Sequence, residues 1–501
     1  MKLFAERVKP RQAVADTLAL FAFEDGKSLA GGWASDRRFE KRYDDAARAE
    51  DFKGKEKTVL VFYPESAKPA RRIIVAGLGK ASGFDAEKLR RAAAAIANRV
   101  KPLDGREITF GLPLDRRAAV PAREQAQAAV EGLLLAFYEY RKYKSKPNGS
   151  PSKLSRVRLA VTSEGDAAPL KEGAERARIF ADATCLTRDL VNEPPSVCTP
   201  RYLAEAAEEV AKGADSISVK VIDEKEAKKL GMGGLLGVSA GSTEPPRFVH
   251  MTYTSPDAKA TVAVLGKGIT FDSGGLCIKP ADGMLNMKDD MSGAAAVIGI
   301  FKALRELKPR INVHGIFAAS ENMPGGGAYK TRDVLRAMNG KTMEIINTDA
   351  EGRLILADAL SYASRLKPSE IIDMATLTGA CVVALGPDMS AIFTASDKLQ
   401  KGILAAAKAQ GEKVWPLPLE NEYLDMIKSD VADMKNSGGR WAGAITAALF
   451  LNRFITKTES WAHFDIPAWT DRPKPGRRKG AEANAIRAMF AVIDARFGEK
   501  R

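Results

Sequence analysis

Short apolar runs alternate with amphipathic stretches along most of this 501-residue chain. After Asn192, four runs have the composition of buried strands and four stretches have the apolar spacing of helices. The strand candidates are 261–265, 311–319, 343–346 and 370–374, and the helix candidates are 201–212, 291–307, 354–365 and 442–454. This alternation predicts an α/β fold with a central, largely parallel mixed sheet flanked by helices. Ligands of such sheets bind where the strands end at their carboxyl termini.

The residues before this region form a second α/β pattern. Runs at 58–62 and 72–76 predict strands, Asp85 predicts a helix N-cap, and 121–140 predicts a helix. After a polar, turn-rich stretch at 142–151, a strand at 157–161 and a helix at 170–190 are expected. We therefore predict a smaller N-terminal α/β domain over 1–168, a linker helix over 169–190 and a larger α/β domain over 191–501.

The net charge of +14 does not by itself indicate a nucleic-acid partner, because basic residues are scattered along the chain. The densest cluster, residues 472–479, is short and contains two prolines, so it predicts a basic loop. No apolar run approaches the roughly 20 residues that span a membrane, and the N-terminus lacks the apolar segment of a secretory signal. The four cysteines form no C-x-x-C pair. We expect a cytoplasmic protein without disulfides.

The eight residues 347–354, Asn-Thr-Asp-Ala-Glu-Gly-Arg-Leu, place Asp349, Glu351 and Arg353 at every second position. In an extended segment, alternate side chains point to the same side. Two neighbouring carboxylates repel each other unless a cation joins them. The pattern therefore indicates a site for divalent metal ions.

Two further stretches carry candidate ligands. A glycine-rich segment, 266–280, follows the strand that is predicted to end at Leu265, and it contains Lys267, Asp272 and Lys279. The segment 287–294 opens a helix and adds Asp290. Together these acids and cations could hold two ions about 3.5–4 Å apart that share a water molecule. Taken one at a time, the same residues could equally be ordinary ion pairs and helix caps.

Histidines contribute little to this prediction, because the chain has only three and no H-E-x-x-H motif. His314 lies in a strand-like run and His463 lies between two aromatic residues, so both are expected to be packed and hydrogen-bonded. A G-x-S-x-G pattern at 237–241 matches the nucleophile elbow of serine hydrolases. No apolar strand leads into Ser239, and we expect a loop there instead.

The stretches 188–194, 266–280, 321–324, 347–354, 373–380 and 461–466 together resemble the leucyl aminopeptidase (cytosol aminopeptidase) family of two-metal exopeptidases. The resemblance covers the chain from about Arg188 to Asp465. It implies a catalytic C-terminal domain, peptide substrates, release of N-terminal and often apolar residues, two Mn²⁺ or Zn²⁺ ions per subunit, and a homohexamer.

The resemblance also implies roles for individual residues. Asp272 and Glu351 would each touch both ions, Lys267 and Asp290 would complete the tighter site, and Asp349 would complete the more exchangeable one. Two further residues would be catalytic, and four would line the pocket for the first residue of the substrate. Lys279 would stabilise the oxyanion, Arg353 would hold a bicarbonate ion, and the pocket residues would be Met287, Thr376, Leu377 and Gly379.

The chain departs from the family pattern at three places, 331–333, 467–469 and 480–484. The last lies close to the substrate pocket of the family, so the departure leaves the side-chain preference open. Two alternatives to an active peptidase also remain. One is a DNA-binding or scaffolding role, which the basic charge permits, and the other is a catalytically inactive member, against which the intact set of candidate ligands argues.

Overall fold

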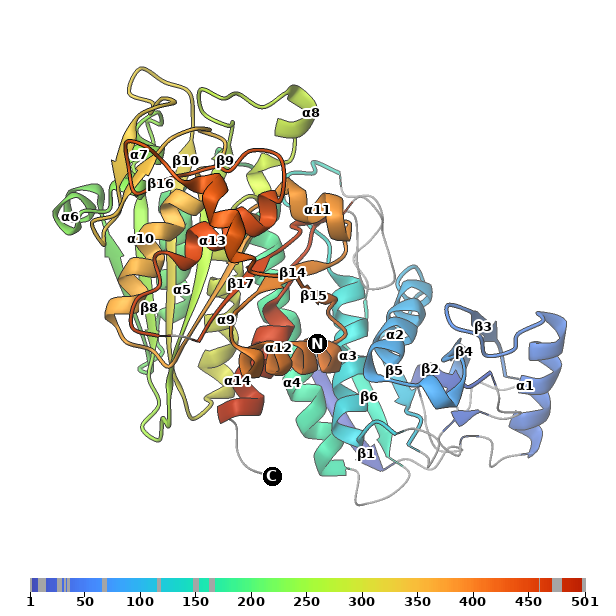
Figure 1. Cartoon of the computed structure of the whole chain (residues 1–501). Helices are drawn as coiled ribbons and strands as arrows, with labels where there is room; N and C mark the ends of the chain where they lie inside the picture. The colour runs from blue at the N-terminus through green and yellow to red at the C-terminus, as the bar shows by residue number, and fades with distance from the viewer. Residues whose placement is uncertain are drawn as a thin grey trace. The chain divides into compact units, whose positions relative to one another are not determined.

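The computed structural model describes residues 2–7, 15–24, 29–30, 33, 37–64, 70–114, 119–146, 153–161, 167–458, 460–470 and 480–497. The described residues up to Asp182 form one compact unit, and those from Ala183 onward form a second (Figure 1). The basic loop predicted at 472–479 lies outside the described residues.

The first unit is built on a six-stranded sheet that is parallel except at one edge, where β3 runs antiparallel to β4. Its order is β1 (Lys2–Arg7), β6 (Arg156–Val161), β5 (Glu107–Gly111), β2 (Ala15–Ala22), β4 (Ala70–Gly77) and β3 (Val59–Phe62). The strands predicted at 58–62, 72–76 and 157–161 are confirmed as β3, β4 and β6.

Helices cover both faces of this sheet. Phe21 of β2 packs in a core with α2 (Ala86–Val100) and α3 (Ala122–Phe137), whereas its neighbour Leu20 packs in a core with α1 (Arg37–Ala49). This division follows from the twofold periodicity of a strand. Asp85 caps α2 as predicted, because its carboxylate accepts a hydrogen bond of 2.8 Å from Lys88 N. A 3₁₀ turn, η3 (Ala81–Gly83), precedes this helix.

The helix predicted at 170–190 is confirmed as α4 (Ala167–Asn192), and the division between the two units falls inside it.

The second unit contains an eight-stranded sheet whose centre is parallel. Its order is β15 (Val414–Pro416), β14 (Ser390–Phe393), β17 (Trp461–Asp465), β13 (Glu370–Ala375), β9 (Thr261–Asp272), β10 (Asn312–Asn322), β8 (Arg247–Tyr253) and β7 (Ile217–Ile222). β17, β13, β9 and β10 are parallel to one another, while β8 and β14 join this centre antiparallel. The predicted mixed, largely parallel sheet is confirmed.

Helices lie on both faces of the large sheet. Leu265 of β9 shares a core with Leu354 of α10 (Gly352–Arg365), with α7 (Gly233–Ser239) and with α13 (Gly443–Asn452). The next residue of β9, Gly266, faces α9 (Ser292–Leu307), and α5 (Pro200–Ala211) packs beside α9. The four predicted helices of this unit are confirmed as α5, α9, α10 and α13. The remaining helices are α6 (Glu224–Leu230), α8 (Ala281–Met284), α11 (Gly379–Leu385), α12 (Asp397–Gln410), α14 (Ile486–Phe497), η5 (Met287–Asp289) and η6 (Asn421–Ile427).

The prediction for 343–346 is wrong in one respect. β12 (Thr342–Glu344) belongs to a separate small sheet with β11 (Val334–Arg336) and β16 (Met434–Lys435), not to the central sheet. Met343 and Ile345 are nevertheless fully buried in the core that contains α10. An apolar run reports burial, and burial alone does not determine which sheet the strand joins.

The loop predicted at 237–241 is also wrong in part, because residues 237–239 form the last turn of α7. Ser239 donates its hydroxyl hydrogen bond to Leu236 O at 3.1 Å, as a helical serine commonly does. This geometry is not that of a nucleophile elbow, in which the serine sits on a strand-to-helix turn.

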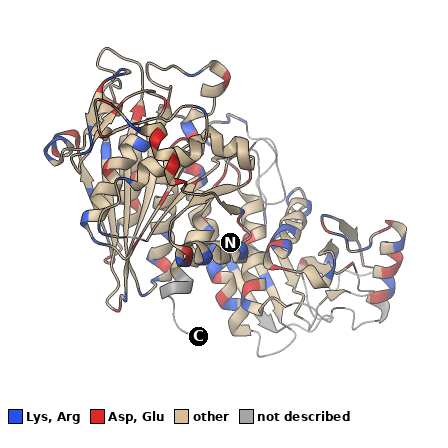
Figure 2. Ribbon diagram, in the orientation of Figure 1, with Lys and Arg blue, Asp and Glu red and all other residues tan. Residues whose placement is uncertain are grey.

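Lysine and arginine side chains are distributed among acidic ones along both units (Figure 2). No helix in the described part of the chain combines the length and apolar character needed to span a membrane. The four cysteines all lie in the described part, and none forms a disulfide.

Candidate metal centre

A β-bulge brings Lys267 and Asp272 to the same site. Both residues belong to β9 (Thr261–Asp272), so the prediction that this strand ends at Leu265 is wrong. Residues five apart on a regular strand point to opposite faces. The register of β9 with β10 shifts by one residue between Ile269 and Phe271. The extra residue in β9 turns the Asp272 side chain to the same face of the sheet as the Lys267 side chain.

Close packing of α9 places Asp290 beside Lys267. Asp290 lies between η5 and the first turn of α9. A Cβ atom on Gly266 would lie 2.3 Å from the Gly293 carbonyl carbon, and one on Gly293 would lie 2.1 Å from Met374 O. The start of α9 can therefore approach β9 and β13 only because both positions are glycine.

The segment 347–354 is not extended, so the predicted alternation of side chains is wrong. Asp349 lies in a turn, Glu351 has helical backbone angles (φ −77°, ψ −36°) as the N-cap of α10, and Arg353 lies in the first turn. The three side chains still reach one cavity, because the chain turns into the helix at this point. Gly352 leaves room for Lys267, since a Cβ at this position would lie 2.5 Å from Lys267 Cε.

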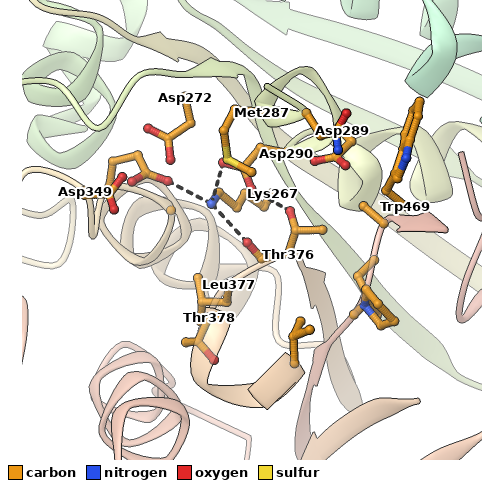
Figure 3. Close-up of a pocket in the computed structure, with 18 of the residues that line it drawn as sticks. Lys267, Asp272, Met287, Asp289, Asp290, Asp349, Thr376, Leu377, Thr378 and Trp469 are labelled. Atoms are coloured by element: carbon orange, nitrogen blue, oxygen red, sulfur yellow. Dashed lines mark hydrogen bonds and ion pairs between the residues drawn. The ribbon is translucent and has the colours of Figure 1, made fainter. Parts of the chain in front are cut away.

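Two lysines separate the four acids of the site. Lys267 Nζ lies 2.7 Å from Asp290 Oδ2 and 2.8 Å from Glu351 Oε1, and it also lies 3.2 Å from Thr376 O (Figure 3). Lys279 Nζ lies 2.9 Å from Asp272 Oδ2 and also contacts Asp349. The lysines compensate charges that would otherwise repel each other in a buried site.

The carboxylates fit divalent ions as well as they fit lysines. One oxygen each of Asp272, Asp290 and Glu351 lies within 4.8 Å of the others. The second oxygen of Glu351, Oε2, is buried and has no hydrogen-bond partner in the described part of the chain. A buried carboxylate oxygen without a partner is costly, and a hard or borderline cation would supply one.

The pKa values of these groups reflect burial and mutual charge. Burial lowers the pKa of Lys267, but Asp290, Glu351 and Asp272 outweigh it, so the pKa is raised. Burial raises the pKa of Asp290 well above its usual range, although Lys267 opposes this. Burial lowers the pKa of Arg353 to about 10. Both Lys267 and Arg353 are therefore cations at neutral pH in this structure.

One cavity of ≈ 520 Å³ brings the sequence predictions together. The five candidate metal ligands, the two candidate catalytic residues and the four candidate pocket residues all line it. They come from β9, the loop after it, η5, the loop before α9, the start of α10 and the segment that follows β13. His314 and His463 are hydrogen-bonded as predicted, to His250 and Asp373 respectively.

Three buried residues that support the site were not predicted from the sequence. Asn322 donates to Asp272 Oδ1 at 2.8 Å, and Asp465 accepts hydrogen bonds from the backbone of Leu377 and Thr378. Asn436 accepts from Ile346 N at 2.8 Å, and its own carbonyl accepts from Arg353 Nη1 at 2.8 Å. Asn322 and Asp465 lie in stretches that carry the family resemblance, whereas no pattern singled out Asn436.

Comparison with known proteins identifies the family. Residues 185–490 match the catalytic domain of the cytosol aminopeptidase family, and residues 19–147 match its N-terminal domain. The chain belongs to the cytosol aminopeptidase family. Probable cytosol aminopeptidases of Nostoc punctiforme and Aquifex aeolicus are 42% and 43% identical to it, and each match covers 95% of both chains.

Solved structures agree with this assignment. A mutant of tomato leucine aminopeptidase superposes with a TM-score of 0.88 at 35% identity, covering 98% of this chain and 96% of its own. The bottromycin maturation enzyme BotP, solved in complex with Mn, has a TM-score of 0.85 at 36% identity, covering 96% and 99%. As a family member with this fold, the chain is an enzyme of the aminopeptidase class, that is, a hydrolase.

The departure from the family pattern at 480–484 lies against the wall of the cavity. β19 (Gly480–Ala481) pairs antiparallel with β18 (Trp469–Thr470), and Glu482 N donates to Ala468 O at 2.8 Å. Ala468 and Trp469 both line the cavity. The unusual segment therefore supports the wall of the cavity at Ala468 and Trp469.

Proposed function

We propose that this chain is a two-metal aminopeptidase that removes N-terminal residues, often apolar ones, from peptides. One observation carries the proposal: every residue expected to bind metal, to act in catalysis or to form the substrate pocket lines the same cavity. Membership of the cytosol aminopeptidase family supports it, and the Mn complex of BotP supports a divalent metal.

In this proposal, two Mn²⁺ or Zn²⁺ ions occupy the acidic cluster. Asp272, Glu351, Lys267, Asp290 and Asp349 would hold these ions, with Asp272 and Glu351 shared between them, Lys267 and Asp290 completing the tighter site, and Asp349 completing the more exchangeable one. Lys267 must lose its proton to become a ligand, because only the neutral amine has a lone pair. The ammonium group of Lys267 contacts Asp290 and Glu351, two of the carboxylates that would hold an ion.

When bound, such ions lower the pKa of a shared water and polarise the scissile carbonyl. Lys279 keeps its charge beside Asp272 and Asp349 and stabilises the negative charge that develops on the substrate oxygen. Arg353 is held by Asn436 through Nη1, while its buried Nε has no hydrogen-bond partner in the described part of the chain. This guanidinium would hold a bicarbonate ion, whose chemistry when bound would be to accept the proton of the attacking water and return it.

The walls of the cavity support a preference for apolar side chains. The cavity that Thr376 and Gly379 line has apolar wall residues, which include Met287, Leu377, Val382, Pro387 and Ile466. Apolar walls bind apolar side chains through the release of ordered water.

The proposal is tested by hydrolysis of a leucyl anilide. Protein treated with chelator is expected to lose activity and to regain it on addition of Mn²⁺ or Zn²⁺, and Glu351→Ala should abolish it under both conditions. Asp282→Ala, on the exposed surface of α8, removes an acid outside the cavity and serves as the control. Activity that is indifferent to chelator, or that survives Glu351→Ala at the wild-type rate, would refute the two-metal account.

We further propose a homohexamer that resides in the cytoplasm. The family resemblance supports the hexamer, and the absence of disulfides among the four cysteines fits a reducing compartment. Light scattering should give about six times the chain mass of 54.0 kDa. A monomer at assay concentration would contradict the hexamer.

The comparisons give no support to a DNA-binding role.

A further inference from the structure

Asp289 is a buried acid in the cavity wall with no part in the proposed metal cluster. It closes η5, directly before Asp290, and only 6% of its surface is exposed. It lines the same cavity as the candidate metal ligands. Figure 3 shows Asp289 near Trp469 on one side of the view, with Asp349 and Asp272 on the other.

Asp289 differs from the other cavity acids in making no ion pair with a described residue, since the charges of Lys288 and Lys267 act on it from beyond ion-pair distance. Asp272 and Asp349 contact Lys279, and Asp290 and Glu351 contact Lys267. Within the described part of the chain, no ion pair and no side-chain hydrogen bond joins the Asp289 carboxylate to another residue. Buried charges in proteins are usually paired, because an unpaired one loses its hydration without compensation. A carboxylate in this situation favours a cation that enters from the cavity.

The nearest lysine in sequence does not serve as this cation. Lys288 donates to the backbone carbonyls of Asn192 and Glu193, at 2.6 and 3.4 Å, and its ammonium lies 5.6 Å from the centre of the Trp469 ring. These contacts direct the hydrogens of the ammonium group towards carbonyl oxygens. Lys288 acts on the Asp289 carboxylate through longer-range charge and not through an ion pair, so a cation from the cavity can still contact this carboxylate.

The wall around Asp289 suits the aliphatic stem of a long basic side chain. Met287, Ile466, Ala468 and Trp469 line the cavity together with Asp289. Lysine and arginine bury their methylene groups on apolar surfaces while the charged end reaches a polar partner. A leucine-like side chain would meet the same apolar wall without a group that could pair with the carboxylate.

We propose that Asp289 is a specificity-determining residue that recognises the cationic side chain of an N-terminal lysine or arginine. This proposal rests on the proposed aminopeptidase function, because it assumes that the substrate amine and scissile bond lie at the acidic cluster. It extends the substrate class from apolar residues to basic ones with long aliphatic stems.

The test compares lysyl and norleucyl p-nitroanilides, since norleucine has the lysine stem without the ammonium group. With the Mn²⁺-loaded enzyme, kcat/KM should be higher for the lysyl substrate. In Asp289→Asn, the ratio of the lysyl kcat/KM to the norleucyl kcat/KM should fall by about tenfold or more. The norleucyl kcat/KM should rise, because the apolar end of the norleucyl side chain no longer faces a buried charge. Asp282→Asn removes the same charge from exposed α8 and should leave the ratio at the wild-type value.

Calorimetric binding of lysinamide and norleucinamide gives a readout that is independent of turnover, and the same shift of the ratio is expected there. A ratio that stays constant in Asp289→Asn, or two values that fall equally, would overturn the proposal while leaving metal-dependent hydrolysis intact. Failure of the Mn²⁺-loaded wild type to hydrolyse either anilide would instead overturn the proposed function, and this inference with it.

Discussion

Lys267 lies where two buried carboxylates would otherwise face each other without a counter-charge. Its ammonium group contacts Asp290 and Glu351, and all three side chains are nearly inaccessible to solvent. Removing one partner from such a cluster leaves uncompensated buried charge, which costs far more than the loss of a surface ion pair. In the absence of metal, this lysine therefore stabilises the folded protein.

Lys267→Met should destabilise the metal-free protein by about 3 kcal/mol, measured by urea unfolding in the presence of chelator. The matched control is Lys330→Met, which breaks the exposed 3.0 Å contact with Asp333 and should cost less than about 1 kcal/mol. Equal losses in the two variants would show that Lys267 does not compensate the buried acids.

Gly352 is a residue whose role depends on its lack of a side chain. An alanine Cβ at 352 would lie 2.5 Å from Lys267 Cε and 2.7 Å from Lys267 Nζ. We expect Gly352→Ala to displace Lys267 and reduce both metal content and activity, by about tenfold for activity, even though alanine favours helices. Gly326→Ala, where a Cβ meets no atom within 4 Å, should change neither. Normal metal content in Gly352→Ala, measured by elemental analysis, would contradict this reasoning.

Residue types and spacing were enough to find the candidate ligands, but not to explain how they meet. Asp349, Glu351 and Arg353 were expected to converge by strand alternation, and they converge instead through a turn and the first turn of α10. The convergence of Lys267 and Asp272 depends on a bulge in β9 that no local sequence pattern predicts. Asn436 was missed because its role arises from hydrogen bonds to residues about 90 positions away.

Among the elements, the turn between β13 and α11 is held from the neighbouring strand. Asp465 of β17 accepts from Leu377 N and Thr378 N at 3.1 and 3.2 Å, and from Thr378 Oγ1 at 2.6 Å. The same turn places the Thr376 hydroxyl 2.7 Å from Asp290. Asp465 thus holds the turn in the cavity wall, and its charge also acts on Arg353.

Asp465→Asn replaces one accepting oxygen with a donor that faces a hydroxyl or backbone N–H group. We expect the turn to loosen and KM to rise by about tenfold, with metal content retained. Thr394→Val removes a half-buried hydrogen bond from Thr394 Oγ1 to Trp461 O, outside the cavity, and should leave KM at the wild-type value. An unchanged KM in Asp465→Asn would refute the positioning role.

A histidine pair joins two antiparallel strands of the large sheet. His250 of β8 lies 2.9 Å from His314 of β10 and 3.1 Å from the Tyr362 hydroxyl. Burial, with contributions from His314 and Lys220, lowers the pKa of His250 to about 4. The ring is therefore neutral at pH 7 and resists protonation in the folded state.

This depressed pKa makes stability depend on pH. The unfolded chain binds a proton near pH 6.5, whereas folded His250 does so only near pH 4. The contribution of neutral His250 to the free energy of unfolding is complete above pH 6.5. It is lost as the pH falls towards 4, because protons then bind the unfolded chain more readily than the folded one. The drop in unfolding free energy from pH 7 to pH 5, measured with urea, should be smaller in His250→Phe than in the wild type. An equal or larger drop in the variant would contradict the prediction.

Element types were predictable where periodicity was strong, and the exceptions have physical causes. α9 and α10 follow from apolar residues at helical spacing, and Asp85 capped α2 as its residue type suggests. The prediction placed β12 in the wrong sheet, because an apolar run indicates that a strand is buried but does not indicate which sheet it joins. Residues 237–239 form a helix although they include a glycine, which lowers helix propensity without forbidding it.

At the scale of the whole molecule, the site exists because segments far apart in sequence meet at one end of a mixed sheet. β9 and β13 are adjacent in the sheet although about 100 residues separate them, and the cavity lies where residues near or beyond their carboxyl ends gather. The α/β class and the family were predictable from the sequence. The strand order, which makes 266–280 and 373–380 neighbours, was not predicted, because local patterns do not specify which strands pair.

The metal cluster gives this architecture a direct test. Bound ions would link carboxylates from three places in the fold: β9, the residues before α9 and the start of α10. Metal binding should therefore also raise the midpoint of unfolding of the protein. Binding to the folded state alone adds about 2.7 kcal/mol when the free ion is at 100 times its Kd.

The most direct measurement is the number of ions bound per chain, determined by calorimetric titration of chelator-treated protein with Mn²⁺ and followed in parallel by leucyl anilide hydrolysis. The account predicts two ions per chain, full activity only when both are bound, and loss of both stoichiometry and activity in Glu351→Gln. Full activity with one ion or none, or two ions bound with unaltered activity in Glu351→Gln, would contradict it.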